Sequence, residues 1–227
     1  MTLKMILMVY NILSTKILND RHRKEFTDRK FSLHEKNFIK ISPLIFSFNK
    51  TNSPIIFSSK NAVKIVLSKD KMKKNLIKND FFCVGNETKK LLVKNNLKVI
   101  SSFPNGYELA EYLIKKKINK DYSFFCGNRR MNTIEKKLKA NNYSIKTVEV
   151  YKTDLTPKKI SKKFDAILFF SPSGVKSFLS INSITSERCF CIGSTTASEL
   201  MPFTKKIHIS ENPTIKKLIW ELNNFYN

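Results

Sequence analysis

The sequence predicts an α/β protein of two similar lobes, in which helices flank parallel sheets. Three observations support this fold class. Short apolar runs rich in β-branched and aromatic residues alternate with helical patterns, one block of sequence occurs twice, and an extended segment precedes each copy. Strands that alternate with helices build parallel sheets covered on both faces. At 227 residues, 41% of them hydrophobic, the chain is long and apolar enough for two such cores.

The first predicted element is a β-strand that begins within the run Met5–Tyr10 and extends to Leu18. The run is too short to cross a bilayer, and no small-residue cleavage site of a signal peptide follows it. No other segment approaches membrane length. The sequence therefore predicts a cytoplasmic protein that does not enter a membrane.

An internal repeat supplies the next elements. Ile55–Leu67 (IIFSSKNAVKIVL) is similar to Ile167–Leu179 (ILFFSPSGVKSFL), with Ser59 aligned to Ser171. Two further matches follow in the same order: Val84–Thr88 with Ile192–Thr196, and Pro104, Leu109 and Leu113 with Pro213, Leu218 and Leu222. Each copy reads as strand, turn, helix, strand, turn and helix, with the last helices signalled by Asn105 and Pro213. Three matched blocks indicate two copies of one structural unit.

Two extended segments, Asn37–Pro43 and Ser144–Lys152, have alternating apolar residues, and each follows a strand, at Ile12–Ile17 and at Ser123–Cys126. We expect each segment to leave one lobe and enter the other, because no Gly/Ser linker is present. The predicted lobes are residues 1–43 plus 153–227, and the inserted residues 44–152.

Five polar turns follow predicted strands and run into helical patterns. They are Ser58–Asn61, Gly85–Thr88, Gly127–Arg130, Ser171–Gly174 and Gly193–Thr196. Ligands of parallel α/β sheets bind at the carboxyl ends of strands, where helix N-termini offer N–H groups to carboxylate or phosphate oxygens. Helix capping alone explains any single turn, whereas five such turns favour a cleft for a polyanion.

The net charge of +24 comes from 42 basic and 18 acidic residues. It suits nucleic acid, an anionic membrane surface or an acidic small substrate. The lysines are spread along the whole chain among many asparagines and isoleucines, as expected of an A- and T-rich genome. The charge alone therefore does not identify a partner.

Few groups capable of metal or nucleophilic chemistry are present. Cys83, Cys126, Cys189 and Cys191 lie in apolar runs without a CxxC pair, so a zinc site or disulfide framework is not predicted. Cys189 and Cys191 are expected on one face of a strand. Dinucleotide, P-loop and HExxH motifs are absent, as are Ser/His/Asp groupings. We expect no cofactor and no metal, and chemistry that uses backbone dipoles, hydroxyls and a tyrosine.

Several motifs resemble the uroporphyrinogen-III synthase family, over about Ile12 to Leu222. They are CGNRRMNTIEKKL (126–138), VEVYKT (148–153), FFSPSGVKSFL (169–179), CIGSTTASEL (191–200) and NPTIKKLIWEL (212–222). The resemblance implies two α/β lobes joined by a two-stranded ladder, with the substrate between them. Such a hinged pair of lobes needs no second subunit, so we expect a monomer.

The resemblance implies hydroxymethylbilane as the substrate, a linear tetrapyrrole that carries eight carboxylates. The reaction expels the terminal hydroxyl as water and closes the macrocycle with inversion of the last pyrrole ring. Without an enzyme the substrate closes uninverted, so much of the catalysis is orientation.

Site residues follow from the same resemblance. Tyr151 in VYKT matches a tyrosine suspected of donating a proton to the departing hydroxyl, although a tyrosine that only packs in the strand fits the pattern equally well. Lys16 stands where the family has arginine, which weakens a bidentate grip on carboxylate. The substrate-binding positions implied are Thr15, Lys16, Ser58, Ser59, Thr88, Gly127, Asn128, Arg129, Ser171, Ser173, Gly174, Thr195 and Thr196.

Two other classes of protein remain open. A nucleic-acid-binding protein would interleave basic residues with exposed aromatics, whereas Phe81–Phe82, Phe124–Phe125 and Phe169–Phe170 lie inside predicted strands. A two-lobed anion-binding protein without catalysis would carry the same turns.

Overall fold

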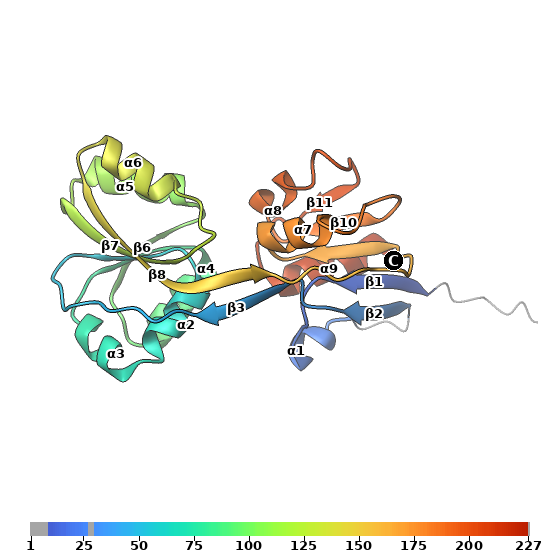
Figure 1. Ribbon diagram of the computed structural model, residues 1–227, viewed down its shortest axis with the longest axis horizontal. Coiled ribbons are helices and arrows are strands. Elements are labelled where there is room, and N and C mark those ends of the chain that lie inside the picture. Colours follow the sequence, from blue (N-terminus) through green and yellow to red (C-terminus); the bar gives the residue numbers. More distant parts are fainter. Residues whose placement is uncertain (1–8, 27–29, 227) are drawn as a thin grey trace, which may run out of the picture. The chain divides into compact units, whose positions relative to one another are not determined.

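The computed structural model describes residues 9–26 and 30–226. The chain divides into two compact units. Unit 1 is the chain up to Lys40 together with the chain from Asp154 onward, and unit 2 is Ile41–Thr153. Each unit has one sheet with helices on both faces (Figure 1). The predicted α/β class with parallel sheets is therefore confirmed.

Unit 2 is built on a sheet in the order β3-β8-β7-β4-β5-β6. All strands but β3 pair in parallel with their neighbours. The strands are β3 (Ile39–Pro43), β4 (Ile55–Phe57), β5 (Phe81–Val84), β6 (Val99–Phe103), β7 (Asp121–Gly127) and β8 (Ser144–Leu155). The three residues of β4 are fully buried, as expected of a central strand covered on both faces.

Five helices cover this sheet. They are α2 (Lys60–Leu67), α3 (Asp70–Leu76), α4 (Asn86–Lys94), α5 (Gly106–Lys116) and α6 (Thr133–Ala140). Helices α2, α3 and α4 pack on one face around Phe57, which stacks with Phe81 and Phe125 at ring-centroid distances of 6.2 and 5.4 Å. Helices α5 and α6 pack on the other face (Figure 1). Phe81, Phe82, Phe124 and Phe125 are all fully buried, so their predicted core placement is confirmed.

Unit 1 has a sheet in the order β11-β10-β9-β1-β2, all parallel. Its strands are β1 (Tyr10–Ser14), β2 (Phe31–Glu35), β9 (Ala166–Phe169), β10 (Arg188–Cys191) and β11 (Ile207–Ile209). Its helices are α1 (Asp20–Arg23), α7 (Pro172–Leu179), α8 (Ser194–Ser198) and α9 (Ile215–Tyr226). Helices α7 and α8 pack on one face and α9 on the other. Cys189 and Cys191 lie in the same core cluster, so they share a face as predicted.

The two sheets have the same arrangement of equivalent strands. The sequence repeat equates β4, β5 and β6 with β9, β10 and β11, and these occupy equivalent places in the orders β6-β5-β4-β7-β8 and β11-β10-β9-β1-β2. The remaining strands, β7–β8 and β1–β2, complete each sheet on the same side. They follow the repeat in unit 2 and precede it in unit 1, so the units are circular permutations of one architecture.

The chain passes between the units in β3 and in β8. These strands are neighbours. Leu44 N donates to Val150 O at 2.9 Å, and Thr156 N donates to Phe38 O at 2.9 Å, so the two strands run antiparallel. This is the two-stranded ladder expected from the family resemblance.

The first strand ends earlier than predicted. Residues 5–8 lie outside the described chain, and β1 ends at Ser14 instead of Leu18. Beyond it, side chains replace the neighbouring strand as hydrogen-bond acceptors. Asn37 Oδ1 accepts from Ile17 N at 2.9 Å, and Glu35 Oε1 accepts from Leu18 N at 2.6 Å. Among the described residues, none of the helices has the length and apolar character needed to cross a membrane.

Candidate functional site

In each sheet, successive strands are added first on one side of the earliest parallel strand and later on its other side. The sheet therefore changes direction beside that strand. In unit 1 this point lies between β1 and β9, and in unit 2 between β4 and β7. Ligands of open α/β sheets bind at such points, outside the carboxyl ends of the strands. The residues that follow these four strands are therefore the first candidates for a site.

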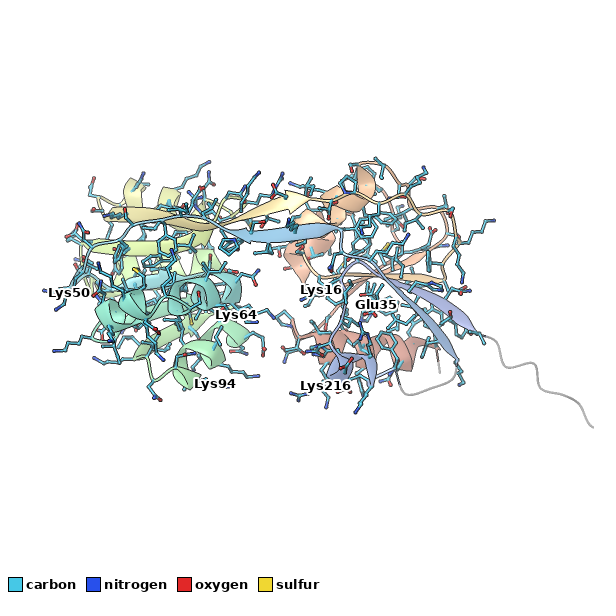
Figure 2. The ribbon with its side chains drawn as sticks, turned by 60° about the horizontal axis from the view of Figure 1, so that its bottom comes forward. Lys16, Glu35, Lys50, Lys64, Lys94 and Lys216 are labelled. Atoms are coloured by element: carbon cyan, nitrogen blue, oxygen red, sulfur yellow. The ribbon has the colours of Figure 1, made fainter. Side chains whose placement is uncertain are left out.

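In unit 1 the two strand ends are joined by Thr15. Its N and Oγ1 both donate to Leu168 O, at 3.1 and 2.7 Å, and the residue is 4% exposed. The next residue, Lys16, is exposed, and Figure 2 shows it in the same unit as Glu35, the last residue of the neighbouring strand β2. The structure thus gives Thr15 an anchoring contact and places the charged side chain of Lys16 directly after it.

The turn after β9 caps α7. Ser171 Oγ accepts from Gly174 N at 3.1 Å and lies 3.2 Å from Ser173 Oγ. A Cβ on Gly174 would contact Ser171 Oγ at 3.3 Å and Thr15 Oγ1 at 3.8 Å. The predicted residues Thr15, Ser171, Ser173 and Gly174 therefore form one cluster at the point where the sheet of unit 1 changes direction.

In unit 2 the corresponding cluster is built around Tyr151. Its hydroxyl donates to Ser59 Oγ at 3.2 Å, and Ser59 Oγ also accepts from Asn61 N at 3.1 Å as the N-cap of α2. The Tyr151 ring lies directly over Gly127, where any Cβ would overlap ring atoms. Only glycine fits at the end of β7, because the Tyr151 ring lies over Gly127 and places its hydroxyl next to Ser59 at the end of β4.

The turn after β7 is tied to β8 by two predicted residues. Asn128 N donates to Tyr151 O at 3.1 Å, and Asn128 Oδ1 accepts from Thr153 N at 2.9 Å. Arg129 is exposed, and its Nε donates to Thr153 O at 3.0 Å. This turn does not run directly into a helix as expected, because α6 begins only at Thr133.

The remaining predicted positions lie at other places along the strand ends. Thr88 and Thr196 follow β5 and β10, one strand further out, and both are buried. Thr195 is exposed, and Ser58 is half-buried just after β4. At Thr88 and Thr196 the backbone N–H groups donate to Gly85 O and Gly193 O, each at 3.1 Å. These backbone bonds close the two turns, and a role of the threonine side chains in binding stays a prediction.

Burial keeps the tyrosine hydroxyl and the cysteine thiols near these strand ends protonated. It raises the pKa of Tyr151, against the opposite effect of the hydrogen bond with Ser59, so the hydroxyl remains a proton donor at neutral pH. Burial also raises the pKa of Cys126 to about 12 and that of Cys83 to about 11, so both thiols stay neutral. No group of three or more His, Cys, Asp or Glu side chains within the described residues could hold a metal ion.

A cavity of about 180 Å³ in unit 1 lies elsewhere. Its lining includes Phe164, Ile167 and Glu187, near the amino ends of β9 and β10. No predicted site residue lines it. The cavity therefore does not belong to the cluster at the carboxyl ends of the strands.

Sequence reasoning missed three charged residues that join the turn after β7 to α6 and β8. Arg130 forms ion pairs with Glu135 of α6 and with Glu149 of β8. The only signal was local: Arg130 belongs to the Gly-Asn-Arg-Arg motif, and Glu149 lies two residues before Tyr151. The motif did not indicate that Arg130 forms the ion pairs while Arg129 bonds the backbone of Thr153.

Taken together, the structure defines a protein of two permuted α/β units that present hydroxyls, backbone N–H groups and a neutral tyrosine at their strand ends. A family model described as uroporphyrinogen-III synthase HemD matches residues 20–220. The chain belongs to the uroporphyrinogen-III synthase family. It is accordingly an enzyme of heme biosynthesis with a small-molecule tetrapyrrole substrate.

Solved structures show the same fold. Uroporphyrinogen-III synthetase from Helicobacter pylori is 18% identical, with a TM-score of 0.69 over 96% of this chain and 100% of that chain. A mutant uroporphyrinogen III synthase from the extremely thermophilic bacterium Thermus thermophilus is 10% identical, with a TM-score of 0.67 over 95% of this chain and 98% of that chain. None of the curated proteins matches this chain.

Proposed function

We propose that this chain is a uroporphyrinogen-III synthase, a hydro-lyase that closes hydroxymethylbilane with inversion of its last pyrrole ring. The family match over residues 20–220 supports the reaction. The observation that carries the mechanism is the position of the Tyr151 hydroxyl, 3.2 Å from Ser59 Oγ at the point where the sheet of unit 2 changes direction. We further propose that it acts in the cytoplasm, because its four cysteines are free and buried as in a reducing compartment. We also propose a monomer, because each unit has its own sheet and core and needs no second subunit to complete it.

In this mechanism Tyr151 is the proton donor for the first step. The O–H that donates to Ser59 turns to the terminal hydroxyl of the substrate, the C–O bond breaks, and water leaves. The lone pair of the pyrrole nitrogen supplies the electrons, which yields an azafulvenium cation paired with the Tyr151 phenolate. The proton lost when the macrocycle closes restores the phenol. A donated proton of this kind accelerates a reaction about 10²- to 10⁴-fold.

The strand-end turns hold the substrate carboxylates. Ser171 and Ser59 cap α7 and α2, whose N-termini offer N–H groups and the positive ends of the helix dipoles. Lys16 and Arg129 add positive charge at the ends of β1 and β7. These groups restrict a flexible chain to conformations in which the inverted ring closes, which is catalysis by orientation.

The product isomer decides the proposal. Purified protein is given hydroxymethylbilane, and the macrocycles are oxidised and separated by chromatography. We expect isomer III well above the level formed without protein. Isomer I alone, at the spontaneous rate, would reject the synthase and leave an anion-binding protein.

A further inference from the structure

The pairing of β7 with β8 is irregular beside the site. Cys126 pairs with Glu149, but the next residue, Gly127, pairs with Tyr151. Val150 therefore has no partner on β7, and its carbonyl accepts from Leu44 N of the β3 side instead. One extra residue on one strand is a β-bulge, a feature that redirects side chains and is often found next to active sites.

The bulge determines the face on which Tyr151 lies. Successive residues of a regular strand point to opposite faces, yet Val150 and Tyr151 both pack in the cluster under α2 and α4. Glu149 lies on the opposite face, where its carboxylate meets Arg130 beside Glu135 of α6. If β8 kept a regular alternation through Val150, Tyr151 would share the face of Glu149, away from Ser59.

Arg130 contacts both strands at the bulge. Its Nη1 donates to Glu149 Oε1 at 2.7 Å and lies 3.5 Å from Gly127 O, so it bonds the residue before the bulge on β8 and the residue opposite Tyr151 on β7. Its Nε donates to Glu135 Oε1, which fixes the guanidinium on α6. Hydrogen bonds between such charged partners are among the strongest in proteins.

We infer that Arg130 is a positioning residue that, through Glu149, holds the β8 bulge and so aims the Tyr151 hydroxyl at the ends of β4 and β7. The position of the Tyr151 hydroxyl can be measured without turnover. Its consequence for activity rests on the proposed role of Tyr151. The ion pairs of Arg130 with Glu149 and Glu135 favour a single pairing of β7 with β8, in which the Tyr151 ring lies over Gly127.

Glu149 is the better residue to change. The side chain of Glu135 is only 9% exposed, and removal of Arg130 would leave its carboxylate buried without a partner, which unfolds many proteins. The side chain of Glu149 is 44% exposed, so Glu149→Ala removes the contact at the bulge with little cost in folding. Glu111→Ala is the matched control, because it removes another exposed carboxylate, paired with Lys137 of α6.

The readout is ¹⁹F NMR of protein labelled with 3-fluorotyrosine, in which the Tyr151 signal is assigned by its loss in Tyr151→Phe. We expect Glu149→Ala to shift or broaden this signal and Glu111→Ala to leave it in place. We also expect Glu149→Ala to lower kcat about tenfold with KM unchanged, because small displacements of a reacting group are costly. In the Tyr151→Phe background, Glu149→Ala should cause no further loss, as for two residues that act through one contact.

The outcomes separate the two claims. An unchanged Tyr151 signal in Glu149→Ala overturns the positioning role. A shifted signal with unchanged kcat upholds the positioning role and rejects the role of Tyr151 in catalysis. If the unsubstituted protein makes no isomer III, the proposed function fails, and the ¹⁹F signal still decides the position.

Discussion

The hydroxyl of Tyr151 has two competing descriptions, a proton donor and a packing group. The ring lies against Gly127 and the core of unit 2, which is structural, while the hydroxyl reaches only the cap residue Ser59. A hydroxyl needed only for stability would contribute about 1 kcal/mol through that hydrogen bond. A proton donor contributes far more to the rate than to the stability, so one substitution distinguishes the two.

We expect Tyr151→Phe to lower kcat for isomer III about 100-fold, at a cost of about 1 kcal/mol in the free energy of unfolding. Turnover and thermal unfolding are measured on the same samples. The control is Tyr143→Phe, which removes a hydroxyl that donates to Ile114 O at 3.2 Å, before β8 begins. It should lower stability to a similar extent and leave kcat unchanged. Equal kcat in Tyr151→Phe and the unsubstituted chain would make Tyr151 a packing residue.

The sequence predicts residue roles that depend on near neighbours in the chain, such as helix capping. It does not predict roles that depend on how distant strands pair. Ser59 and Ser171 follow an apolar run and precede a helical pattern, so their capping follows from the sequence. The bulge at Val150 depends on how β8 pairs with a strand more than twenty positions earlier, and on ion pairs of Arg130. Neither leaves a periodic signal in the sequence.

Helix α7 illustrates how one element combines stability and binding. It begins with Pro172, which fits the first turn, and its cap Ser171 satisfies Gly174 N. It also follows β9, one of the two strands at which the sheet of unit 1 changes direction. The end of α7 that the cap stabilises is therefore the end we expect to face a carboxylate.

We expect Ser171→Ala to lower stability by about 1 kcal/mol through loss of the cap, and to weaken binding of the macrocyclic product several-fold. Binding is measured by calorimetry under anaerobic conditions. Asn105→Ala is the control, since Asn105 caps α5 through a 2.9 Å bond from Glu108 N at the end of the edge strand β6. Both variants should lose similar stability, and only Ser171→Ala should lose affinity. Equal affinities would assign Ser171 to capping alone.

The alternation of elements and the internal repeat were readable because both are patterns along the chain. The circular permutation that relates the two units could be predicted from the sequence only in part. Blocks around Ser59 and Ser171 match closely, but β1–β2 and β7–β8 share little sequence and were paired by their place in the order alone. The end of β1 was misplaced because the acceptors of Ile17 and Leu18 are the side chains of Asn37 and Glu35, which belong to later segments.

The net charge of +24 belongs to the whole molecule. The lysines labelled in Figure 2 come from different elements: Lys50 precedes β4, Lys64 lies in α2 and Lys94 ends α4. The phenylalanines that would stack on nucleic acid bases are mostly buried in strands. The exposed aromatic side chains among the described residues come from separate segments, Tyr107 from α5, Phe203 from the turn after α8, and Trp220 and Phe225 from α9. Single-stranded nucleic acid is instead bound by successive stacked aromatics along one basic groove. The scattered lysines do create a positive field that attracts a polycarboxylate.

This field predicts a salt dependence of substrate capture. We expect KM for hydroxymethylbilane to rise about tenfold between roughly 0.03 and 0.5 M NaCl while kcat changes little, because salt screens long-range attraction more than contacts within the site. Initial rates of isomer III formation are measured across the series. Sucrose at matched osmolarity is the control, since it changes the medium without screening charge. A KM that is flat in salt would mean that the surplus lysines reflect composition alone, and that capture depends only on the few cations at the strand ends, such as Lys16 and Arg129.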